Sequence, residues 1–220
     1  MNSETKLFSG IIAVTAVIII GAAFAFSRPA NILPVDPKIL IKEDSYKTSS
    51  ASAIVTLVNF GDFQCPACGA YHTVVKQLEA KYKDSMAVIF RHFPLSMHPN
   101  AVPAAMAAEA AGKQGKFWEM HDKLYETQAE WSDEKKTEDI FSTYAKDIQL
   151  DVEQFKKDLS NADLQNRINR DVTDANTLHI NATPTFYVNN IKIKNPASLA
   201  DFEEVIKSAI EKAATTSASK

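Results

Sequence analysis

A run of β-branched and apolar residues at 54–60 leads, through a short turn, into the motif Cys65-Pro66-Ala67-Cys68. Such a run is typical of a buried strand. Proline is well tolerated in the first turn of a helix, so we expect Pro66 to begin one. A second apolar run at 86–93 follows. Between the runs, apolar side chains recur every three or four residues, at Tyr71, Val74, Val75, Leu78 and Tyr82. This strand–helix–strand order predicts an α/β fold with parallel strand pairing.

The sequence from 101 to 178 has the pattern of several helices. Alanine is abundant at 101–111, and apolar side chains then recur at helical spacing up to Leu178. Asp151 suits the N-cap of one of these helices. Each apolar set on its own indicates core packing and nothing more.

Residues typical of β-strands occur again at 185–188 and 191–193, on either side of Asn189 and Asn190. Asparagine tolerates positive φ, which favours a hairpin with a two-residue turn. Ser198 is expected to cap a last helix with one apolar face.

The N-terminal part contains an uncharged segment at 7–27, nearly all apolar from 11 to 26. About 20 apolar residues span a hydrocarbon core of about 30 Å. One interpretation is a signal-anchor helix over about 7–26; the other is a signal peptide cleaved after Ala23-Phe24-Ala25. The length favours the anchor, since a signal peptide's apolar region has about 7–15 residues. Both interpretations predict an extracytoplasmic protein, either anchored in the cell membrane or, after cleavage, secreted or periplasmic.

Composition suggests four parts of the chain. We expect a signal segment at 1–27, a linker at 28–52, a folded domain at 53–212 and a flexible tail at 213–220. Within the linker, prolines disfavour helix and 39–41 has the composition of a short strand. Hydrophobic residues make up 45% and charged residues 23%, which excludes a wholly disordered chain and a multi-span membrane protein. A net charge of −3 gives no basic surplus, so no nucleic-acid partner is expected.

The chain has only two cysteines, Cys65 and Cys68, and both lie in the C-x-x-C motif. A thiol at a helix N-terminus faces the positive end of the helix dipole, which stabilises its thiolate. The pKa of cysteine falls from about 8.5 towards about 3.5–7.5 in such motifs. Because the thiolate is the nucleophile in disulfide exchange, the motif predicts redox chemistry. We expect Cys65, at the turn, to be exposed and reactive, and Cys68, on the apolar helix face, to be covered and to resolve the mixed disulfide.

The cysteine pair has two other possible interpretations. A purely structural disulfide closing so short a loop would contribute only about 2 kcal/mol, and a chain of this size has little need of it. A metal site could use His72, which follows Cys68 by four residues. That set supplies three ligands where structural zinc takes four, although thiolates also suit Cu(I). A copper- or zinc-binding module therefore stays an alternative, while no metal is expected in the site.

Three segments taken together resemble a known family: Phe60-Gly61-Asp62-Phe63-Gln64-Cys65-Pro66-Ala67-Cys68, Arg91-His92-Phe93-Pro94-Leu95 and Ala182-Thr183-Pro184-Thr185-Phe186-Tyr187-Val188-Asn189. They are similar to the DsbA-like thiol-disulfide oxidoreductases of the thioredoxin superfamily, in their membrane-anchored form. The resemblance covers about 54–213. It implies a thioredoxin-like fold with a helical insertion at about 97–180, a cis peptide bond at Pro184, and Thr183 in the substrate site.

The resemblance also implies a function. We expect an enzyme that passes the Cys65–Cys68 disulfide to reduced cysteines of exported proteins, with a membrane thiol-oxidising partner and no cofactor. A reductase or isomerase of the same fold is the alternative.

Two departures from the family's usual sequence bear on the choice between an oxidant and a reductase. Asn59 stands where many relatives carry a buried carboxylate, and Pro66-Ala67 lacks the histidine found between the cysteines of strongly oxidising members.

Overall fold

The computed structural model describes residue 15 and residues 34–48 and 52–218. The body of the molecule is the unit Pro34–Lys220. Apart from residue 15, the predicted signal or anchor segment lies outside the described residues. Among the helices that the structure describes, none has both the length and the apolar character needed to cross a membrane.

A four-stranded sheet is built from β1 (Val55–Gly61), β2 (Met86–His92), β3 (Thr185–Val188) and β4 (Ile191–Lys192), in the order β2-β1-β3-β4. β1 pairs with β2 in parallel, and β3 runs antiparallel to both β1 and β4. The turn between β3 and β4 uses Asn189 and Asn190 at φ 46° and 69°. The predicted parallel pair and the predicted hairpin are therefore confirmed.

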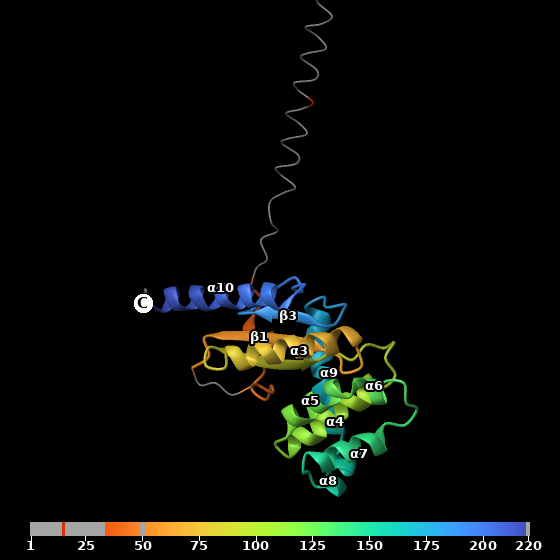
Figure 1. The fold of residues 1–220 in the computed structure, drawn as a ribbon. Helices are drawn as coiled ribbons and strands as arrows, with labels where there is room; N and C mark the ends of the chain where they lie inside the picture. Colours follow the sequence, from red (N-terminus) through yellow and green to blue (C-terminus); the bar gives the residue numbers. More distant parts are fainter. Residues whose placement is uncertain (1–14, 16–33, 49–51, 219–220) are drawn as a thin grey trace, which may run out of the picture. The chain divides into compact units, whose positions relative to one another are not determined.

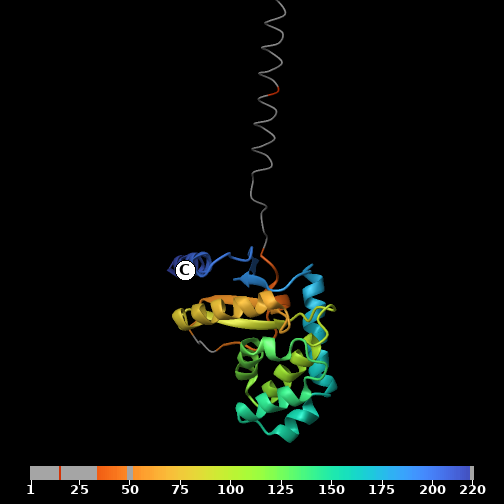
Figure 2. The ribbon, with the colours of Figure 1, turned by 45° about the vertical axis from the view of Figure 1, so that its right-hand side comes forward.

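The helices fall into two groups (Figures 1 and 2). Those that pack on the sheet are α2 (Pro37–Leu40), α3 (Pro66–Lys81) and α10 (Leu199–Ala218). Between β2 and β3 the chain forms α4 (Ala101–Lys113), α5 (Phe117–Glu126), α6 (Gln128–Trp131), α7 (Glu138–Asp147), α8 (Val152–Asp158) and α9 (Ala162–Thr177). This second group confirms the helical insertion. Asp151 caps α8 and Ser198 caps α10, as predicted from the residue types.

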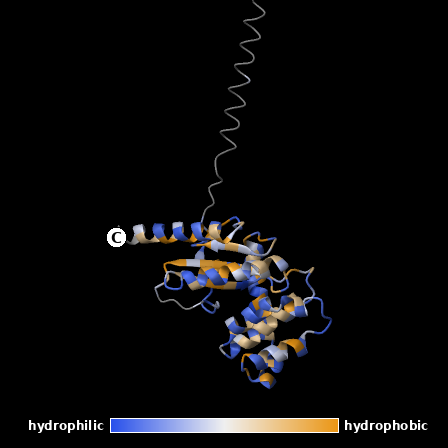
Figure 3. Ribbon diagram, viewed as in Figure 1, coloured by the Kyte–Doolittle hydropathy of each residue, from blue (hydrophilic) through white to orange (hydrophobic). Residues whose placement is uncertain are grey.

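Both faces of the sheet are buried against apolar residues, and the strands are therefore almost continuously apolar in sequence (Figure 3). On one face, Leu57 packs with Leu78 of α3 and Phe202 of α10. On the other face, Val58 and Phe60 pack with Leu40 of α2 and with residues at the end of α9. The sheet is therefore a middle layer between helices.

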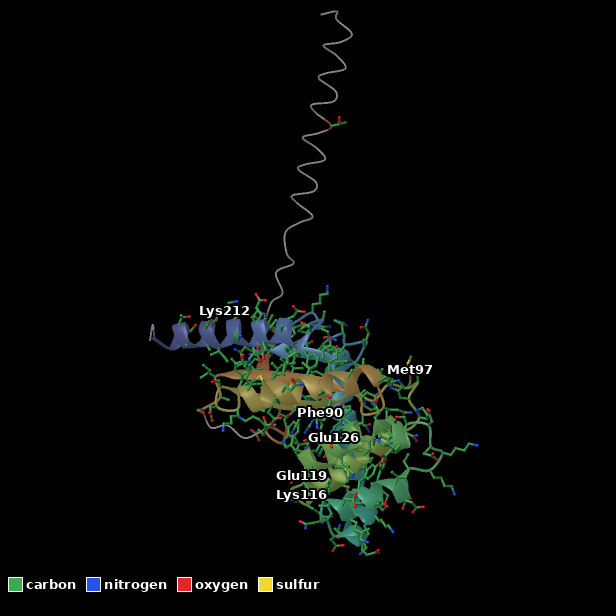
Figure 4. The ribbon with its side chains drawn as sticks, viewed as in Figure 1. Phe90, Met97, Lys116, Glu119, Glu126 and Lys212 are labelled. Atoms are coloured by element: carbon green, nitrogen blue, oxygen red, sulfur yellow. The ribbon has the colours of Figure 1, made fainter. Side chains whose placement is uncertain are left out.

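The helical insertion has its own core, and that core reaches the sheet through aromatic side chains. Phe63 stacks on Phe90 with ring centroids 5.0 Å apart, and Tyr125 of α5 lies 4.9 Å from Phe63. Figure 4 shows Phe90 at the junction between the sheet and the helical lobe. Because both cysteines pack in this same cluster, the motif lies where the helical insertion meets the sheet.

Three expectations at the chain ends are wrong. The short strand expected at 39–41 is instead helix α2 as far as Leu40, because Asp36 caps it and Pro37 occupies its first turn. The linker predicted at 28–52 is in part integral to the fold, since Leu40 is fully buried and Tyr46 stacks on Phe117 at 3.7 Å.

At the C-terminal end, α10 continues to Ala218, inside the tail predicted as flexible. Its alanines favour helix even without an apolar face to bury.

Candidate active site

The C-x-x-C motif lies at the N-terminus of α3. Cys65 is the N-cap residue and Pro66 the first residue of the helix, and the Gly69 N–H donates to the Cys65 carbonyl at 3.1 Å. Pro66 supplies no N–H and has the φ that a first turn needs. Cys68 then falls one turn along, on the buried side of the helix.

Both thiols are covered, which corrects the expectation that Cys65 is exposed. Its exposed fraction is 7%, and that of Cys68 is 3%. The cover comes from segments far away in the sequence. Gln128 of α6 donates from Nε2 to the Cys65 carbonyl at 3.0 Å, and the Thr183 carbonyl lies 3.5 Å from the Cys65 Sγ. Periodicity around the motif gives no information about such distant neighbours.

The Thr183–Pro184 peptide bond is cis, as the resemblance implied. It precedes β3, and β3 pairs directly with β1, the strand that leads to the motif. The fold therefore brings Cys65, Pro66, Ala67 and Cys68 beside Thr183 and Pro184. The Thr183 hydroxyl is buried and has no hydrogen-bond partner among the described residues, so it is free to donate to a thiolate at Cys65.

The two thiols differ in acidity. A hydrogen bond from the Cys68 thiol, assisted by Thr183 and by the backbone N–H groups of Ala67 and Cys68, lowers the pKa of Cys65 to about 5 although burial opposes it. Burial, and then the hydrogen bond to Cys65, raise the pKa of Cys68 far above its usual range. At neutral pH the reduced pair therefore holds one thiolate, at Cys65, and one thiol, at Cys68.

Buried polar residues before and after the motif hold the active-site loops, and the sequence did not single them out for this role. The Asp62 carboxylate accepts hydrogen bonds from the Gln64 and Leu95 N–H groups at 2.8 and 2.9 Å, and it lies 2.7 Å from the His98 Nδ1. Gln64 in turn accepts from the Asn100 N–H at 2.6 Å. The only signal in the sequence was a carboxylate placed three residues before Cys65.

His72 is directed away from the cysteines and towards α5. Its Nε2 lies 3.1 Å from the Asp122 Oδ1, and the His121 Nδ1 lies 2.9 Å from the same oxygen. The Cys-Cys-His set of the alternative metal-binding interpretation is therefore not assembled. In the part of the chain that the structure describes, His72, His121 and Asp122 are the residues that could hold a metal ion, with potential ligand atoms within 4.8 Å of one another.

Comparisons with known proteins agree with this geometry. The family model described as Thioredoxin matches residues 46–208. The chain is also 32% identical over 219 residues to the probable disulfide bond formation protein D of Bacillus cereus, covering 96% of this chain and 98% of that protein. The chain belongs to the DsbA-like thiol-disulfide oxidoreductases. This DsbA-like protein has the thioredoxin-like fold that the resemblance implied, and Cys65–Cys68 is its C-x-x-C pair.

A solved structure and a longer relative complete the comparison. Oxidised BdbD of Bacillus subtilis is 28% identical to this DsbA-like protein, with a TM-score of 0.68 over 76% of this chain and 93% of that chain. The Na(+)/H(+) antiporter NhaA 1 of Mycolicibacterium vanbaalenii is 40% identical over 149 residues, which are 66% of this chain. The match spans only 23% of the antiporter's length.

Proposed function

We propose that this DsbA-like protein works as an oxidant, which transfers the Cys65–Cys68 disulfide to pairs of reduced cysteines in exported proteins. The observation that carries the proposal is the position of Cys65 as N-cap of α3, where the Cys68 thiol and backbone N–H groups stabilise its thiolate. These neighbours lower the pKa of Cys65 to about 5. A stabilised thiolate favours the reduced form over the disulfide. A disulfide whose reduced form is stabilised is a strong oxidant.

The exchange has two steps. A client thiolate attacks the Cys65 Sγ, the bond between Cys65 and Cys68 breaks, and Cys68 leaves with the electron pair and takes up a proton. A second client thiolate then attacks the client sulfur of the mixed disulfide and releases Cys65 as a thiolate. The client gains a disulfide and loses two electrons, and the pair in the active site is reduced. The low pKa makes Cys65 a good leaving group in the second step.

The site offers contacts for an extended client segment. The Thr183 carbonyl lies 3.5 Å from the Cys65 Sγ, where a client backbone would have to approach. The Thr183 hydroxyl is buried and has no hydrogen-bond partner among the described residues. Met97, in the loop that follows β2, is 77% exposed and gives this edge of the molecule an apolar side chain (Figure 4). These groups support Thr183 and Pro184 as substrate-binding residues.

Location and partners form part of the same proposal. The apolar segment at about 7–26 supports an extracytoplasmic enzyme anchored in the cell membrane, where disulfides persist. After each turnover the pair must be reoxidised, and a membrane thiol-oxidising protein is the partner expected from the family. No cofactor is needed, because the disulfide is itself the oxidant.

A redox titration tests the direction of exchange. The chain would be equilibrated with mixtures of reduced and oxidised glutathione, and the fraction of disulfide measured by mass after acid quenching. We expect a potential nearer to about −120 mV, as in a strong oxidant, than to about −270 mV, as in thioredoxin. Cys65→Ala is the control, because it has no pair to titrate. A value close to that of thioredoxin would contradict the proposal and favour the reductase or isomerase alternative.

A further inference from the structure

The surface between α10 and the edge strand β4 carries a groove that disulfide exchange does not use. β4 is the last strand in the order β2-β1-β3-β4, so its outer edge has no neighbouring strand among the described residues. The groove has a volume of about 740 Å³, and its lining runs from Val188 across β4 to α10. Val188 ends β3, whereas the cis bond at Pro184 precedes this strand. The groove therefore shares no lining residue with the active site.

Apolar side chains line the groove on both sides. Ile191 of β4 is 41% exposed, and Ile193 follows it in the lining. On the helix side, Val205 and Ala209 pack against the buried core but are themselves only partly buried. A contiguous apolar surface with a polar rim is typical of a site that another molecule covers.

Eight residues of α10 line the groove and form one stripe along the helix. The stripe begins at Asp201 and ends at Thr216, and its spacings alternate between three residues and one. Such spacings keep side chains on one face of a helix. The pattern is the same when counted from either end, and its midpoint lies between Ser208 and Ala209. Because both midpoint residues are small, a second helix can approach closely there.

The two halves of the stripe carry opposite charges. Asp201 and Glu204 lie in the first half, and Lys212 lies in the second (Figure 4). Among the described residues, neither Glu204 nor Lys212 is in an ion pair, whereas Glu203 on another side of the helix pairs with two lysines. The helix dipole does not account for Lys212, because that effect is confined to the last turn and α10 continues to Ala218.

We propose that this groove is the interface of a symmetric dimer, in which α10 of a second copy of the chain lies antiparallel along α10 of the first. A two-fold axis between Ser208 and Ala209 places the stripe of one copy on the same stripe of the other. The stem of Lys212 then lies over Val205 of the second copy, with the ammonium beside Glu204 of that copy. The symmetry forms this ion pair twice.

The charges select this occupant and this orientation. A parallel pair of helices would place Glu204 against Glu204 and Lys212 against Lys212, and like charges that face each other across an interface are unfavourable. An anionic membrane surface fits less well, because the groove carries two carboxylates and one ammonium. The antiparallel second copy is the arrangement in which the stripe is complementary to itself.

Cross-linking of the full-length chain in detergent tests the geometry. Cys65→Ala and Cys68→Ala remove the native thiols, and one cysteine is then introduced on α10 and oxidised with copper phenanthroline. The two copies of Ser208→Cys lie beside the axis, where Cα atoms can come within the reach of a disulfide, about 4.4–6.8 Å. Thr216→Cys is the matched control, since its two copies lie about 22 Å apart at about 1.5 Å per residue. We expect a cross-linked dimer from Ser208→Cys and none from Thr216→Cys.

Charge reversal tests the pairing. Glu204→Lys and Lys212→Glu each turn two attractive pairs into repulsive ones, so the dissociation constant of the dimer should rise about tenfold. The double variant restores both pairs with their signs exchanged, and its dissociation constant should return to near that of the unchanged chain. Glu211→Lys, which makes the same change of charge outside the groove, should have little effect. Sedimentation of the full-length chain in detergent measures each constant, and the rate of disulfide exchange with glutathione checks that each variant is folded.

A chain that sediments as a monomer at every concentration would overturn the dimer. Equal cross-linking of Ser208→Cys and Thr216→Cys, single reversals without effect, or a double variant no better than the single ones would overturn it as well. A monomer in which lipid vesicles protect Ser208→Cys from maleimide would assign the groove to the membrane surface and also overturn the proposal. These outcomes are independent of the redox titration, because the groove contains no residue of the C-x-x-C motif.

Discussion

At the scale of single residues, the two thiols differ because of their positions on one helical turn. Cys65 is the N-cap residue, where backbone N–H groups and the Cys68 thiol stabilise its charge. Cys68 is one turn further in, against Tyr125 and the buried aromatic cluster, where burial disfavours charge. One helix end thus makes a nucleophile of one cysteine and a resolving thiol of the other.

This asymmetry predicts which variant traps clients. Cys68→Ala should accumulate mixed disulfides at Cys65, because the resolving thiol is gone. Cys65→Ala should accumulate none, because Cys68 is buried and protonated. The products would be resolved on non-reducing gels after alkylation of the cells. Equal trapping by the two variants would contradict the assignment of roles.

A second prediction concerns the pH dependence of stability. The pKa of Cys65 is about 5 in the folded reduced chain and about 8.5 when unfolded. Because the folded pKa is depressed, the stabilisation of the reduced form is fully present above about pH 8.5 and is lost as the pH falls through about 5. The reduced chain should therefore melt above the oxidised chain, with a gap that widens from pH 5 to pH 9. Thermal melts of both forms would measure it, and an oxidised form that is more stable at every pH would contradict the oxidant function.

A third prediction uses Asn59, which is 9% exposed on the strand that leads to the motif. Asn59→Asp should raise the pKa of Cys65, because a nearby negative charge disfavours a second one. Thiolate absorbance of the reduced chain against pH measures the change, and Cys65→Ala in the same background identifies the signal of Cys65. An unchanged titration would mean that position 59 is not coupled to the site.

At the scale of the elements, Arg91 joins β2, α9 and residues 34–48, which form an N-terminal arm on the domain. Its side chain is 1% exposed, is paired with Asp171 and Asp174 of α9, and donates to the carbonyls of Ile39 and Leu40 at 2.8 and 2.7 Å. The insertion is therefore held to the sheet by charge at this point, and by aromatic packing at Phe90.

Removing this arginine should be costly. Arg91→Met roughly keeps the volume but removes the buried cation between Asp171 and Asp174, which keep only Arg170 at 4.0 Å and Lys42 at 3.0 Å as cationic partners. Breaking such a buried pair costs about 3–5 kcal/mol. Arg170→Met is the matched control on α9, since its pair with Asp44 is largely exposed and is expected to contribute about 0–1 kcal/mol. Urea unfolding of both variants measures the difference. A loss for Arg91→Met no larger than for Arg170→Met would show that the buried pair does not hold the layers together.

At the scale of the whole molecule, residues 34–48 are part of the folded unit. The Val35 N–H donates to the Asn190 carbonyl at 2.9 Å, Lys47 forms a bridge with Ile89, and Leu40 fills the core behind the sheet. A domain boundary drawn at residue 53 would cut through this core.

Two truncations test the boundary. A chain that begins at Pro34 should fold and exchange disulfides, because every contact above is kept. A chain that begins at residue 53 should be markedly less stable, since the loss of a buried leucine alone costs about 2–5 kcal/mol. Thermal melts and exchange rates would compare the two. Equal stability would mean that the arm packs on the domain without supporting it.

The sequence alone determined the class of fold and the position of the chemistry. Continuous apolar runs, helical periodicity, the C-P-A-C spacing and the paired asparagines are local patterns, and they predicted β1, α3, β2 and the Asn189-Asn190 turn. The tertiary structure alone decided what covers Cys65, where His72 points, and that α2 belongs to the core. Those outcomes depend on contacts such as Cys65 with Thr183, which are 118 positions apart. Local patterns reflect the secondary structure that a segment favours. The burial and the pKa of its side chains depend instead on which distant segments pack against it.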